Sequence, residues 1–264
     1  MCRHLGHVGP APVTLASLVT EPPHALLVQS YAPADMRGGG TVNADGFGVG
    51  FWPDAAGTPD DRSSGPGPRV YKRDAPMWTD SSFLDLAPVI SARSVVAAVR
   101  SATVGMPVST AACAPFRSGV DGTGWLFSHN GVVRGWPGSM AALAAELEPV
   151  DLLTLDSATD SALLWALVRR RLAKGVDPAD ALADVVDRTL HAAPGSRLNL
   201  LLGDGASLWA TAVDHALSVR DGPAGTTVAS EPLDPDPGWT PVPDHHLVVV
   251  RDGAVVVTPL GGRP

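Results

Sequence analysis

The sequence has only two cysteines, Cys2 and Cys113, and no CxxC pair. So few thiols argue against a disulfide framework and favour a reducing compartment, which predicts a cytoplasmic protein. The chain also lacks any run of about 18 apolar residues that could cross a membrane, and its first residues form no apolar signal segment. We therefore expect neither a membrane-spanning helix nor a secretory leader.

Charged residues are scarce at 17% of the chain, and acidic residues outnumber basic ones to give a net charge of −8. This balance argues against nucleic acid or an anionic membrane as a partner, because both attract clustered Lys and Arg. The one basic run, at residues 169–171, fits the solvated end of a helix. We expect a small-molecule ligand, and the sequence does not fix an oligomeric state.

Apolar side chains make up 45% of the 264 residues, enough for one large core, and we expect residues 2–264 to form a single domain. Strand-like segments come first, two long helical segments lie in the middle, and strand-like segments return. Because strands and helices do not alternate, this order argues against a parallel sheet. It predicts an α+β fold of antiparallel sheets with helices outside.

The expected elements can be given by residue number. The longer helices cover residues 157–173 and 177–195, and shorter helices begin at residues 14 and 21 and cover 82–86 and 139–147. The expected strands cover residues 47–51, 70–71, 94–100, 124–131, 198–202, 208–213, 226–230, 245–251 and 254–258. Residues 38–40 and 53–68 are expected to be loops.

Two weaker patterns could indicate a cofactor or metal site. Residues 46–50 carry glycine at alternate positions, as in a dinucleotide-binding turn, but no helix or βαβ unit follows them. The spacing of Cys2, His4 and His7 could hold a metal ion, but no second cluster of ligand residues accompanies it. We therefore expect no cofactor and no metal, and we interpret the glycines as positions where another backbone or a ligand approaches closely.

Cys2 directly follows the initiator methionine, and its small side chain permits removal of Met1. Removal would leave a thiol and a free α-amine on the same residue. An unperturbed thiol titrates near about 8.5 and an α-amine near about 7.7 to 8, so the amine can accept the thiol proton near neutral pH. Cys2 is therefore the candidate nucleophile, although a cysteine at this position could also be incidental.

Four further segments follow Met1-Cys2 in a fixed order. They read Asn43-Ala44-Asp45-Gly46-Phe47-Gly48, Val99-Arg100-Ser101-Ala102-Thr103, His129-Asn130-Gly131 and Thr159-Asp160. Each is a weak signal alone, but in this order and at these separations they make the chain resemble the class II glutamine amidotransferases, a family of N-terminal nucleophile hydrolases. The resemblance implies a four-layer αββα sandwich of antiparallel sheets, which is an α+β fold.

The resemblance also implies an amidohydrolase that cleaves a γ-glutamyl C–N bond through a thioester on Cys2. Attack on an amide carbonyl needs hydrogen-bond donors for the developing oxyanion. The side-chain amide of Asn130 and the backbone N–H of Gly131 suit this role, in which loss of one donor costs about 10²- to 10³-fold in rate. Taken alone, the Asn130-Gly131 pair is also typical of a hairpin turn, and we expect it to end its strand.

Arg100, Thr103 and Asp160 are the implied substrate-binding residues. Arg100 ends a buried strand and can bind the α-carboxylate of a glutamyl group through two parallel hydrogen bonds, and Thr103 can donate to the same carboxylate. Asp160, in the first turn of its helix, can pair with the α-ammonium group. Taken alone, Arg100 also fits an ordinary ion pair, and Asp160 fits a capping box with Ser157.

Within the family, the chain is most similar to the amidohydrolases of ergothioneine biosynthesis, which cleave γ-glutamyl-hercynylcysteine sulfoxide to glutamate and hercynylcysteine sulfoxide. Residues 2–6, 41–50, 100–103 and 229–234 carry this similarity. Many relatives that act on free glutamine have a histidine where this chain has Val104, which disfavours glutamine as a substrate. Two alternatives stay open: a glutaminase subunit that delivers ammonia to a partner and, least favoured, a non-catalytic γ-glutamyl-binding module.

The leaving group of that substrate carries a trimethylammonium group. Aromatic faces attract such cations by about 0.5 to 2 kcal/mol. Trp52, Trp125 and Trp136 lie near the motif segments, and we predict that at least one of them lines the leaving-group side of the site.

Overall fold

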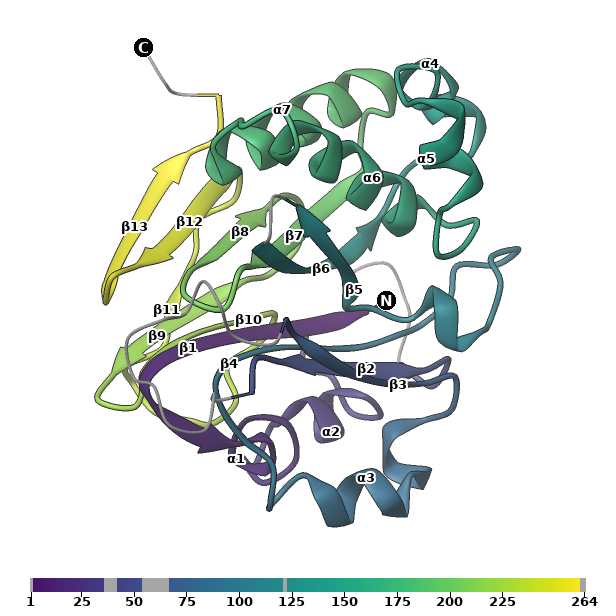
Figure 1. Cartoon of the computed structure of the whole chain (residues 1–264). Helices are drawn as coiled ribbons and strands as arrows, with labels where there is room; N and C mark the ends of the chain where they lie inside the picture. Colours follow the sequence, from purple (N-terminus) through teal and green to yellow (C-terminus); the bar gives the residue numbers. More distant parts are fainter. Residues whose placement is uncertain (1, 36–41, 54–66, 121–122, 262–264) are drawn as a thin grey trace.

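The computed structural model describes residues 2–35, 42–53, 67–120 and 123–261 of the chain. Two antiparallel sheets face each other at the centre, and helices cover their outer faces (Figure 1). The long helices α6 (Asp160–Leu172) and α7 (Pro178–Ala192) lie against one sheet. The short helices α1 (Leu15–Val19), α2 (Leu26–Gln29) and α3 (Ser81–Leu86) lie against the other. The four-layer αββα arrangement expected from the sequence is confirmed.

Each sheet joins segments that are distant in sequence. The seven-stranded sheet has the order β11 (Thr240–Pro241), β9 (Ser218–Gly222), β10 (Gly225–Ala229), β1 (Arg3–Thr14), β4 (Ser91–Val99), β2 (Phe47–Phe51) and β3 (Arg69–Arg73). The six-stranded sheet has the order β13 (Ala254–Pro259), β12 (His246–Arg251), β8 (Leu208–Ala212), β7 (Arg197–Gly203), β6 (Thr123–Val132) and β5 (Phe116–Val120). The strand β1 is thus the middle strand of its sheet.

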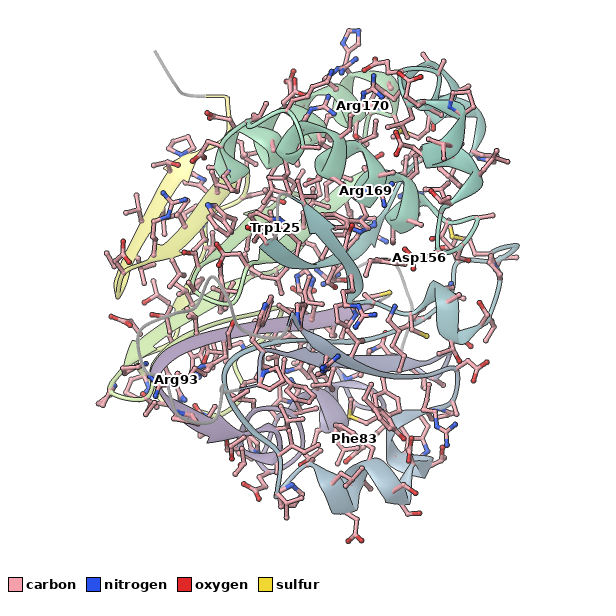
Figure 2. All side chains as sticks on the ribbon, in the orientation of Figure 1. Phe83, Arg93, Trp125, Asp156, Arg169 and Arg170 are labelled. Atoms are coloured by element: carbon pink, nitrogen blue, oxygen red, sulfur yellow. The ribbon has the colours of Figure 1, made fainter. Side chains whose placement is uncertain are left out.

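Three apolar cores hold the four layers together. One lies between the six-stranded sheet and α6 and α7, and it contains the stacked rings of Phe127 and Trp165. A second lies between the two sheets, where Leu126 and Leu201 are fully buried. The third lies between the seven-stranded sheet and α1, α2 and α3, around Phe83 (Figure 2). Both sheets are therefore covered on both faces, which explains why their central strands are so apolar.

The strand β1 is the largest element that the sequence analysis missed. Its sequence contains glycine and proline, which weaken strand propensity, and it shows no clean alternation of apolar and polar residues. Pairing on both edges decides its structure instead: Leu5 lies opposite Ala229 of β10 and opposite Ala97 of β4. Long-range pairing therefore overrides a weak local signal. The short elements β5, β9, β11 and α5 (Pro149–Leu153) were also not expected.

The predicted turn at Asn130-Gly131 is wrong. Both residues lie inside β6, where Asn130 pairs with Asn199 and Gly131 with Leu198 of β7. An Asn-Gly pair favours a hairpin turn only when its backbone is not paired with another strand. Here the pairing with β7 includes both residues and continues to Val132. The strand ends at Val132, so both residues stay within the sheet.

Helix starts also differ from the expectation. Thr159, and not Ser157, caps α6, because its hydroxyl accepts a hydrogen bond from the backbone N–H of Ala162 at 3.2 Å. The expected cap of α7 is confirmed, since Asp177 accepts from the N–H of Ala179 at 2.9 Å. The expected helices from residue 21 and over 139–147 are reduced to α2 and to α4 (Ala141–Ala144), which follows a single 3₁₀ turn.

The basic run at the end of α6 forms surface ion pairs, as a solvated helix end should. Arg169 contacts Asp151 at 3.1 Å and Arg170 contacts Glu148 at 3.3 Å. Figure 2 labels the two arginines. Within the described residues, no helix is both long enough and apolar enough to cross a membrane. The predicted loop at residues 38–40 and most of the predicted loop at 53–68 lie outside the described residues.

Candidate active site

Cys2 lies directly before β1, at the N-terminal end of the middle strand (Figure 1). Because Arg3 pairs with Val99 at the end of β4, Cys2 lies beside the residues that follow β4. Its thiol points to the backbone carbonyl oxygen of Ser101, with the sulfur 3.8 Å away. The residue is partly exposed. Met1 lies outside the described residues.

Arg100 follows β4 directly and is 92% buried, with 8% of its surface exposed. Its backbone is fixed on both sides, because its N–H donates to Gly46 at 2.7 Å and its carbonyl accepts from the N–H of Asp45 at 2.9 Å. One guanidinium nitrogen, Nη2, donates to the carbonyl of Pro107 at 2.9 Å. The other, Nη1, is buried and has no hydrogen-bond partner among the described residues. A buried donor of this kind is costly unless a ligand satisfies it.

The segment around Asp45 supports this arginine. The Asp45 carboxylate accepts a hydrogen bond from the N–H of Ala102 at 2.7 Å, which holds the chain after β4. Gly46 has a φ of +126°, and a Cβ atom there would lie 2.4 Å from the sulfur of Cys113. Burial raises the pKa of the Cys113 thiol to about 11, although the charge of Arg100 opposes this rise. Cys113 is therefore a neutral packing residue near the candidate nucleophile.

The close approaches expected at the glycines of β2 are confirmed. A Cβ atom on Gly48 would lie 2.3 Å from the carbonyl oxygen of Ala114, and one on Gly50 would lie 2.5 Å from a methyl group of Leu126 in the facing sheet. Both contacts are closer than real Cβ atoms show, so glycine is needed at both positions. The next described strand, β3, pairs with β2 antiparallel, whereas a dinucleotide-binding βαβ unit needs parallel strands, so the pairing argues against the dinucleotide interpretation.

Asn130 faces the seven-stranded sheet from β6 and is fully buried. Its Nδ2 atom donates to the hydroxyl of Ser230 at 3.0 Å. The same hydroxyl accepts from the N–H of His4 at 2.9 Å and donates to the His4 carbonyl at 3.2 Å. Because Nδ2 carries two hydrogens, this contact leaves a second donor and fixes its direction. Ser230 thus links Asn130 to the backbone two residues beyond Cys2.

Gly131 directs its backbone toward an open edge of the sheet. Its partner Leu198 donates its own N–H to Val213 at 3.0 Å, so Leu198 faces away from β6. In an antiparallel pair, the N–H of Gly131 must then face away from β7. The neighbouring strand β5 first pairs with β6 only at Phe127. The N–H of Gly131 is therefore directed to the edge that β5 leaves uncovered.

Asp160 begins α6, and its carboxylate binds backbone donors. One oxygen accepts from the N–H of Val133 at 3.0 Å, and the other accepts from the N–H of Ser161 at 2.7 Å. These bonds join the start of α6 to the end of β6, three residues beyond Asn130. Oδ1 also accepts from the Ser161 hydroxyl at 3.2 Å, whereas Oδ2 has one described donor and can accept a further hydrogen bond. The expected capping box with Ser157 does not form.

Thr103 differs from the other predicted site residues because it is exposed. Only its backbone carbonyl has a described contact, with the N–H of Met106 at 2.9 Å. The adjacent Val104 is also fully exposed, at 101% of its reference area. The structure therefore places Thr103 on a surface turn after Arg100 and shows no described contact between its hydroxyl and the arginine.

The alternative metal site at Cys2, His4 and His7 does not form. His4 contacts Ser128 of the facing sheet at 3.1 Å, whereas His7 contacts Thr227 of the neighbouring strand β10 at 2.9 Å. Three residues apart on a strand, the two rings point to opposite faces. Burial lowers the pKa of His4 to about 3 and that of His7 to about 4, so both rings are neutral.

Sequence reasoning missed the buried ion pair between Arg3 and Glu231. The Arg3 side chain is fully buried, pairs with Glu231 and donates to the carbonyl oxygen of Cys2 at 2.9 Å. Glu231 also accepts from His24 at 2.6 Å and from the N–H of Ala34 at 2.8 Å. Burial by itself raises the pKa of Glu231, but these hydrogen bonds and the Arg3 charge hold it below its usual value. Residues 229–234 already stood out in the sequence, but nothing local indicated their partner.

The three candidate tryptophans lie in different surroundings. Trp125 packs on Trp209 in the core between the six-stranded sheet and the long helices, and Trp136 packs against the same core. Trp52 is partly exposed, and its ring nitrogen donates to the carbonyl of Gly124 at 3.2 Å. The ring of Trp125 is therefore part of a core, whereas Trp136 and Trp52 are partly exposed, and the leaving-group contact stays a prediction.

Comparison with known proteins identifies the family of this chain. Residues 14–227 match the family described as "Glutamine amidotransferases class-II". The chain is 44% identical over 261 residues to the gamma-glutamyl-hercynylcysteine sulfoxide hydrolase of Mycolicibacterium smegmatis, an alignment covering 98% of this chain and 100% of that protein. It is 42% identical to the protein of the same name from Mycobacterium tuberculosis, over 98% of this chain and 97% of that protein.

Solved structures of related proteins share the fold. A glutamine aminotransferase class-II domain protein from Silicibacter pomeroyi has a TM-score of 0.64 at 20% identity, covering 98% of this chain and 99% of that chain. An allosteric regulatory enzyme of purine biosynthesis has a TM-score of 0.68 at 12% identity, covering 99% of this chain and 50% of that chain. The family match and the full-length similarity lead to one conclusion: the chain belongs to the class II glutamine amidotransferases.

Proposed function

We propose that this protein is an amidohydrolase that cleaves γ-glutamyl-hercynylcysteine sulfoxide to glutamate and hercynylcysteine sulfoxide, a step of ergothioneine biosynthesis. The observation that carries the proposal is the 44% identity, over almost the whole of both chains, to a hydrolase named for this substrate. The geometry around Cys2 supports the chemistry. The proposal treats residues 2–264 as one unit from which Met1 has been removed.

The reaction begins with the sulfur of Cys2. Its α-amine, directly or through one water, takes the thiol proton, and the thiolate attacks the γ-carbonyl carbon of the glutamyl group. The tetrahedral oxyanion takes hydrogen bonds from Nδ2 of Asn130 and from the N–H of Gly131. The amine then passes the proton to the leaving nitrogen, and the C–N bond breaks. A γ-glutamyl thioester remains on Cys2, and water activated by the same amine hydrolyses it.

The glutamyl group needs recognition of both its charges. Arg100 supplies a buried guanidinium whose Nη1 atom lacks a described partner, and a carboxylate would satisfy it. Asp160 supplies a carboxylate for the α-ammonium group, in addition to accepting hydrogen bonds from the backbone N–H groups of Val133 and Ser161. Thr103 donates a hydrogen bond to the same α-carboxylate if the exposed turn that contains Thr103 closes over the bound glutamyl group. These roles fit a pocket that holds glutamyl groups whatever amine they carry.

Replacing Arg100 with lysine should raise KM for every γ-glutamyl substrate and change kcat little. Lysine keeps the charge but cannot form two parallel hydrogen bonds, and a bond to a charged group is worth about 1.5 to 3 kcal/mol, or roughly 10- to 150-fold. Steady-state kinetics on two γ-glutamyl amides checks this expectation. An unchanged KM on both would remove Arg100 from the binding site.

A panel of γ-glutamyl amides assayed for glutamate release tests the proposed function. We expect the highest kcat/KM on γ-glutamyl-hercynylcysteine sulfoxide and only slow release of glutamate from free glutamine. If glutamine is hydrolysed fastest and releases ammonia, the protein is instead a glutaminase subunit that serves a synthetase partner. If no member of the panel is hydrolysed, although each binds, the chain is a γ-glutamyl-binding module.

A further inference from the structure

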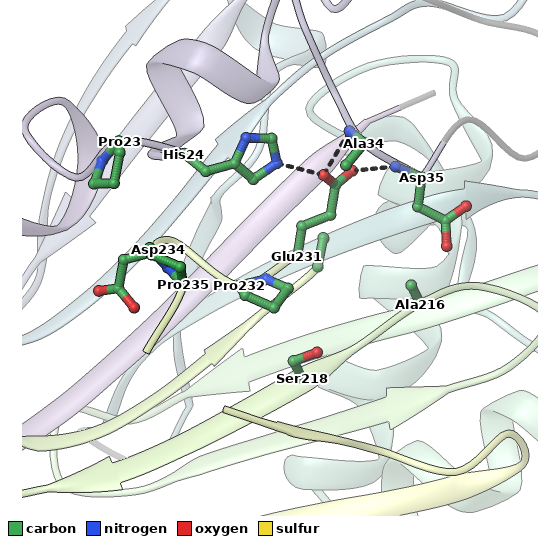
Figure 3. Close-up of a pocket in the computed structure, with 11 residues that line it drawn as sticks. Pro23, His24, Ala34, Asp35, Ala216, Ser218, Glu231, Pro232, Asp234 and Pro235 are labelled. Atoms are coloured by element: carbon green, nitrogen blue, oxygen red, sulfur yellow. Dashed lines mark hydrogen bonds and ion pairs between the residues drawn. The ribbon is translucent and has the colours of Figure 1, made fainter. Parts of the chain in front are cut away.

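Asp160 differs from the other two acidic side chains that are buried in the described part of the chain. Asp80 pairs with an arginine of β3 at 3.3 Å, and Glu231 pairs with the buried Arg3. Figure 3 shows the second contact of Glu231, with His24, in the lining of an open cavity of about 880 Å³. Asp160 has only 5% of its surface exposed and forms no ion pair with any described Lys, Arg or His, so neutral hydrogen-bond donors orient its carboxylate.

A chain of three hydrogen-bond contacts reaches the Asp160 carboxylate from the six-stranded sheet. The Ser161 hydroxyl lies 3.2 Å from Oδ1 of Asp160 and 3.0 Å from Nδ1 of His129 on β6. The other ring nitrogen of His129, Nε2, lies 3.0 Å from the backbone carbonyl oxygen of Arg197 at the start of β7. Because His129 is buried, these contacts and not solvent hold its ring.

The hydrogens of this chain follow from the two acceptors at its ends. A carbonyl oxygen and a carboxylate oxygen can only accept, so Nε2 of His129 carries a hydrogen that it donates to Arg197. When Nδ1 also carries a hydrogen, it donates to the Ser161 hydroxyl, which donates to Asp160. When Nδ1 is bare, the hydroxyl hydrogen is available to either neighbour. In both forms the ring fixes the position of the Ser161 oxygen, and the serine in turn fixes Oδ1 of Asp160.

Gly131 leaves the space that this arrangement needs. His129 and Gly131 lie on the same face of β6, because side chains alternate along a strand, and Asn130 between them faces the other way. A Cβ atom on Gly131 would lie 2.6 Å from Nε2 of His129 and closer still to the carbonyl oxygen of Arg197. Real Cβ atoms do not approach so closely, so a larger residue would push the ring or the carbonyl aside. The strand β6 therefore directs the amide of Asn130 to the facing sheet and the ring of His129 to α6.

We propose that His129 and Ser161 are positioning residues that hold the Asp160 carboxylate where it binds the α-ammonium group, and that they thereby select γ-glutamyl amides over amides without this charge. The inference rests on the proposed function, because it assumes that Asp160 binds the glutamyl group cleaved at Cys2. Both residues act through Asp160 and not by contact with the substrate. Ser161 holds Oδ1, which leaves Oδ2, with the N–H of Val133 as its one described donor, to accept from the ammonium group.

Two substrates that differ only in the α-ammonium group test this role. They are γ-glutamyl-hercynylcysteine sulfoxide and its glutaryl analogue, and release of hercynylcysteine sulfoxide measures the cleavage of both. We expect the wild-type enzyme to prefer the glutamyl substrate in kcat/KM. Ser161→Ala should reduce this preference about fivefold to tenfold, through a higher KM for the glutamyl substrate, because the carboxylate loses a hydrogen bond that orients it. The kcat/KM of this variant on the glutaryl substrate should stay within about twofold of the wild-type value.

Two substitutions of His129 separate its two contacts. Asparagine has its amide at the position of Nδ1, so His129→Asn can still contact Ser161 and should keep most of the preference. Glutamine has its amide at the position of Nε2, so His129→Gln can still contact Arg197 but should lose as much of the preference as Ser161→Ala does. In an Asp160→Asn background, Ser161→Ala should change the preference no further, because both substitutions act through one carboxylate.

Ser157→Ala is the matched control, because Ser157 precedes α6 without capping it, and it should leave the preference unchanged. If the His129 variants do not fold, Ser161→Ala still decides the question, since Ser161 is partly exposed. A wild-type enzyme that cleaves both substrates equally well would overturn the positioning role while the proposed function stands. The same holds if Ser161→Ala leaves the preference unchanged, lowers both rates alike, or acts further in the Asp160→Asn background. A wild-type enzyme that cleaves neither substrate would overturn the proposed function, and the positioning role with it.

Discussion

Cys2→Ala should abolish hydrolysis of the γ-glutamyl substrate while leaving its binding intact. The sulfur is the only atom proposed to bond covalently with the substrate, and removal of a nucleophile typically costs about 10⁴- to 10⁶-fold in kcat. Arg100, Asp160 and the Ser230–Asn130 contact do not depend on the thiol, so the glutamyl pocket should persist. Glutamate release measures the first effect, and calorimetric titration of the variant with substrate measures the second.

Cys113→Ala is the control for this experiment. Cys113 is fully buried and its thiol pKa is raised to about 11, so almost none of it is thiolate at neutral pH. The control variant should keep kcat and lose some thermal stability. Normal rates in Cys2→Ala would contradict the mechanism, and so would an intact-mass measurement showing that the active protein retains Met1.

Asn130→Ala should lower kcat by about 10²- to 10³-fold with little change in KM, as loss of one oxyanion donor does. The contact with Ser230 directs the second hydrogen of Nδ2, so the donor is oriented before substrate arrives. Stopped-flow measurement of thioester formation should show the same loss as steady-state kcat, because the oxyanion forms in that step. Alkylation of Cys2 by iodoacetamide, which forms no oxyanion, should proceed at the wild-type rate.

Ser128→Ala separates this catalytic effect from a packing effect. Ser128 lies on the same strand and the same face as Asn130, and it contacts the His4 ring at 3.1 Å. Its loss should lower Tm, because a buried ring nitrogen loses its partner, but kcat should stay within about threefold. If Ser128→Ala and Asn130→Ala reduce kcat equally, Asn130 only supports the fold.

The layered architecture could be predicted because it depends on order and composition. Two long helices between two sets of strands, with alternating or continuous apolar residues, leave few ways to cover every face. The strand β2 and the helix α7 could be found for the same reason, since alternating apolar residues mark the first and Asp177 with Pro178 marks the start of the second. Local sequence patterns were therefore enough to find both elements.

The errors share a different physical cause. The Asn130-Gly131 pair has a strong local preference for a turn, but β7 pairs with both residues and keeps them in a strand. Likewise β1 shows little strand character of its own, and the two strands beside it determine its structure. A local sequence pattern does not reveal pairing partners that are far away in sequence, so only the structure shows that these residues lie in strands.

The candidate site shows the same division. The residue types Cys2, Asn130 and Arg100 could be identified from their motifs, because the chemistry demands a thiol, an amide and a guanidinium. The Arg3–Glu231 pair and the cavity beside it could not, since they require residues 228 positions apart to meet. The candidate catalytic residues could be found from local motifs, whereas contacts between distant segments appear only in the structure.

The pairing of β1 has a consequence for how the enzyme matures during synthesis. The candidate nucleophile leaves the ribosome long before residues 229 and 230, yet Leu5 must pair with Ala229, and the hydroxyl of Ser230 must bind His4. Until that late segment emerges, the reactive terminus has only part of its sheet and no orientation for Asn130. Domains fold as units as chains are made at about 5 to 20 residues per second, so the nascent polypeptide should stay inactive until residues 229 and 230 have emerged and bound β1.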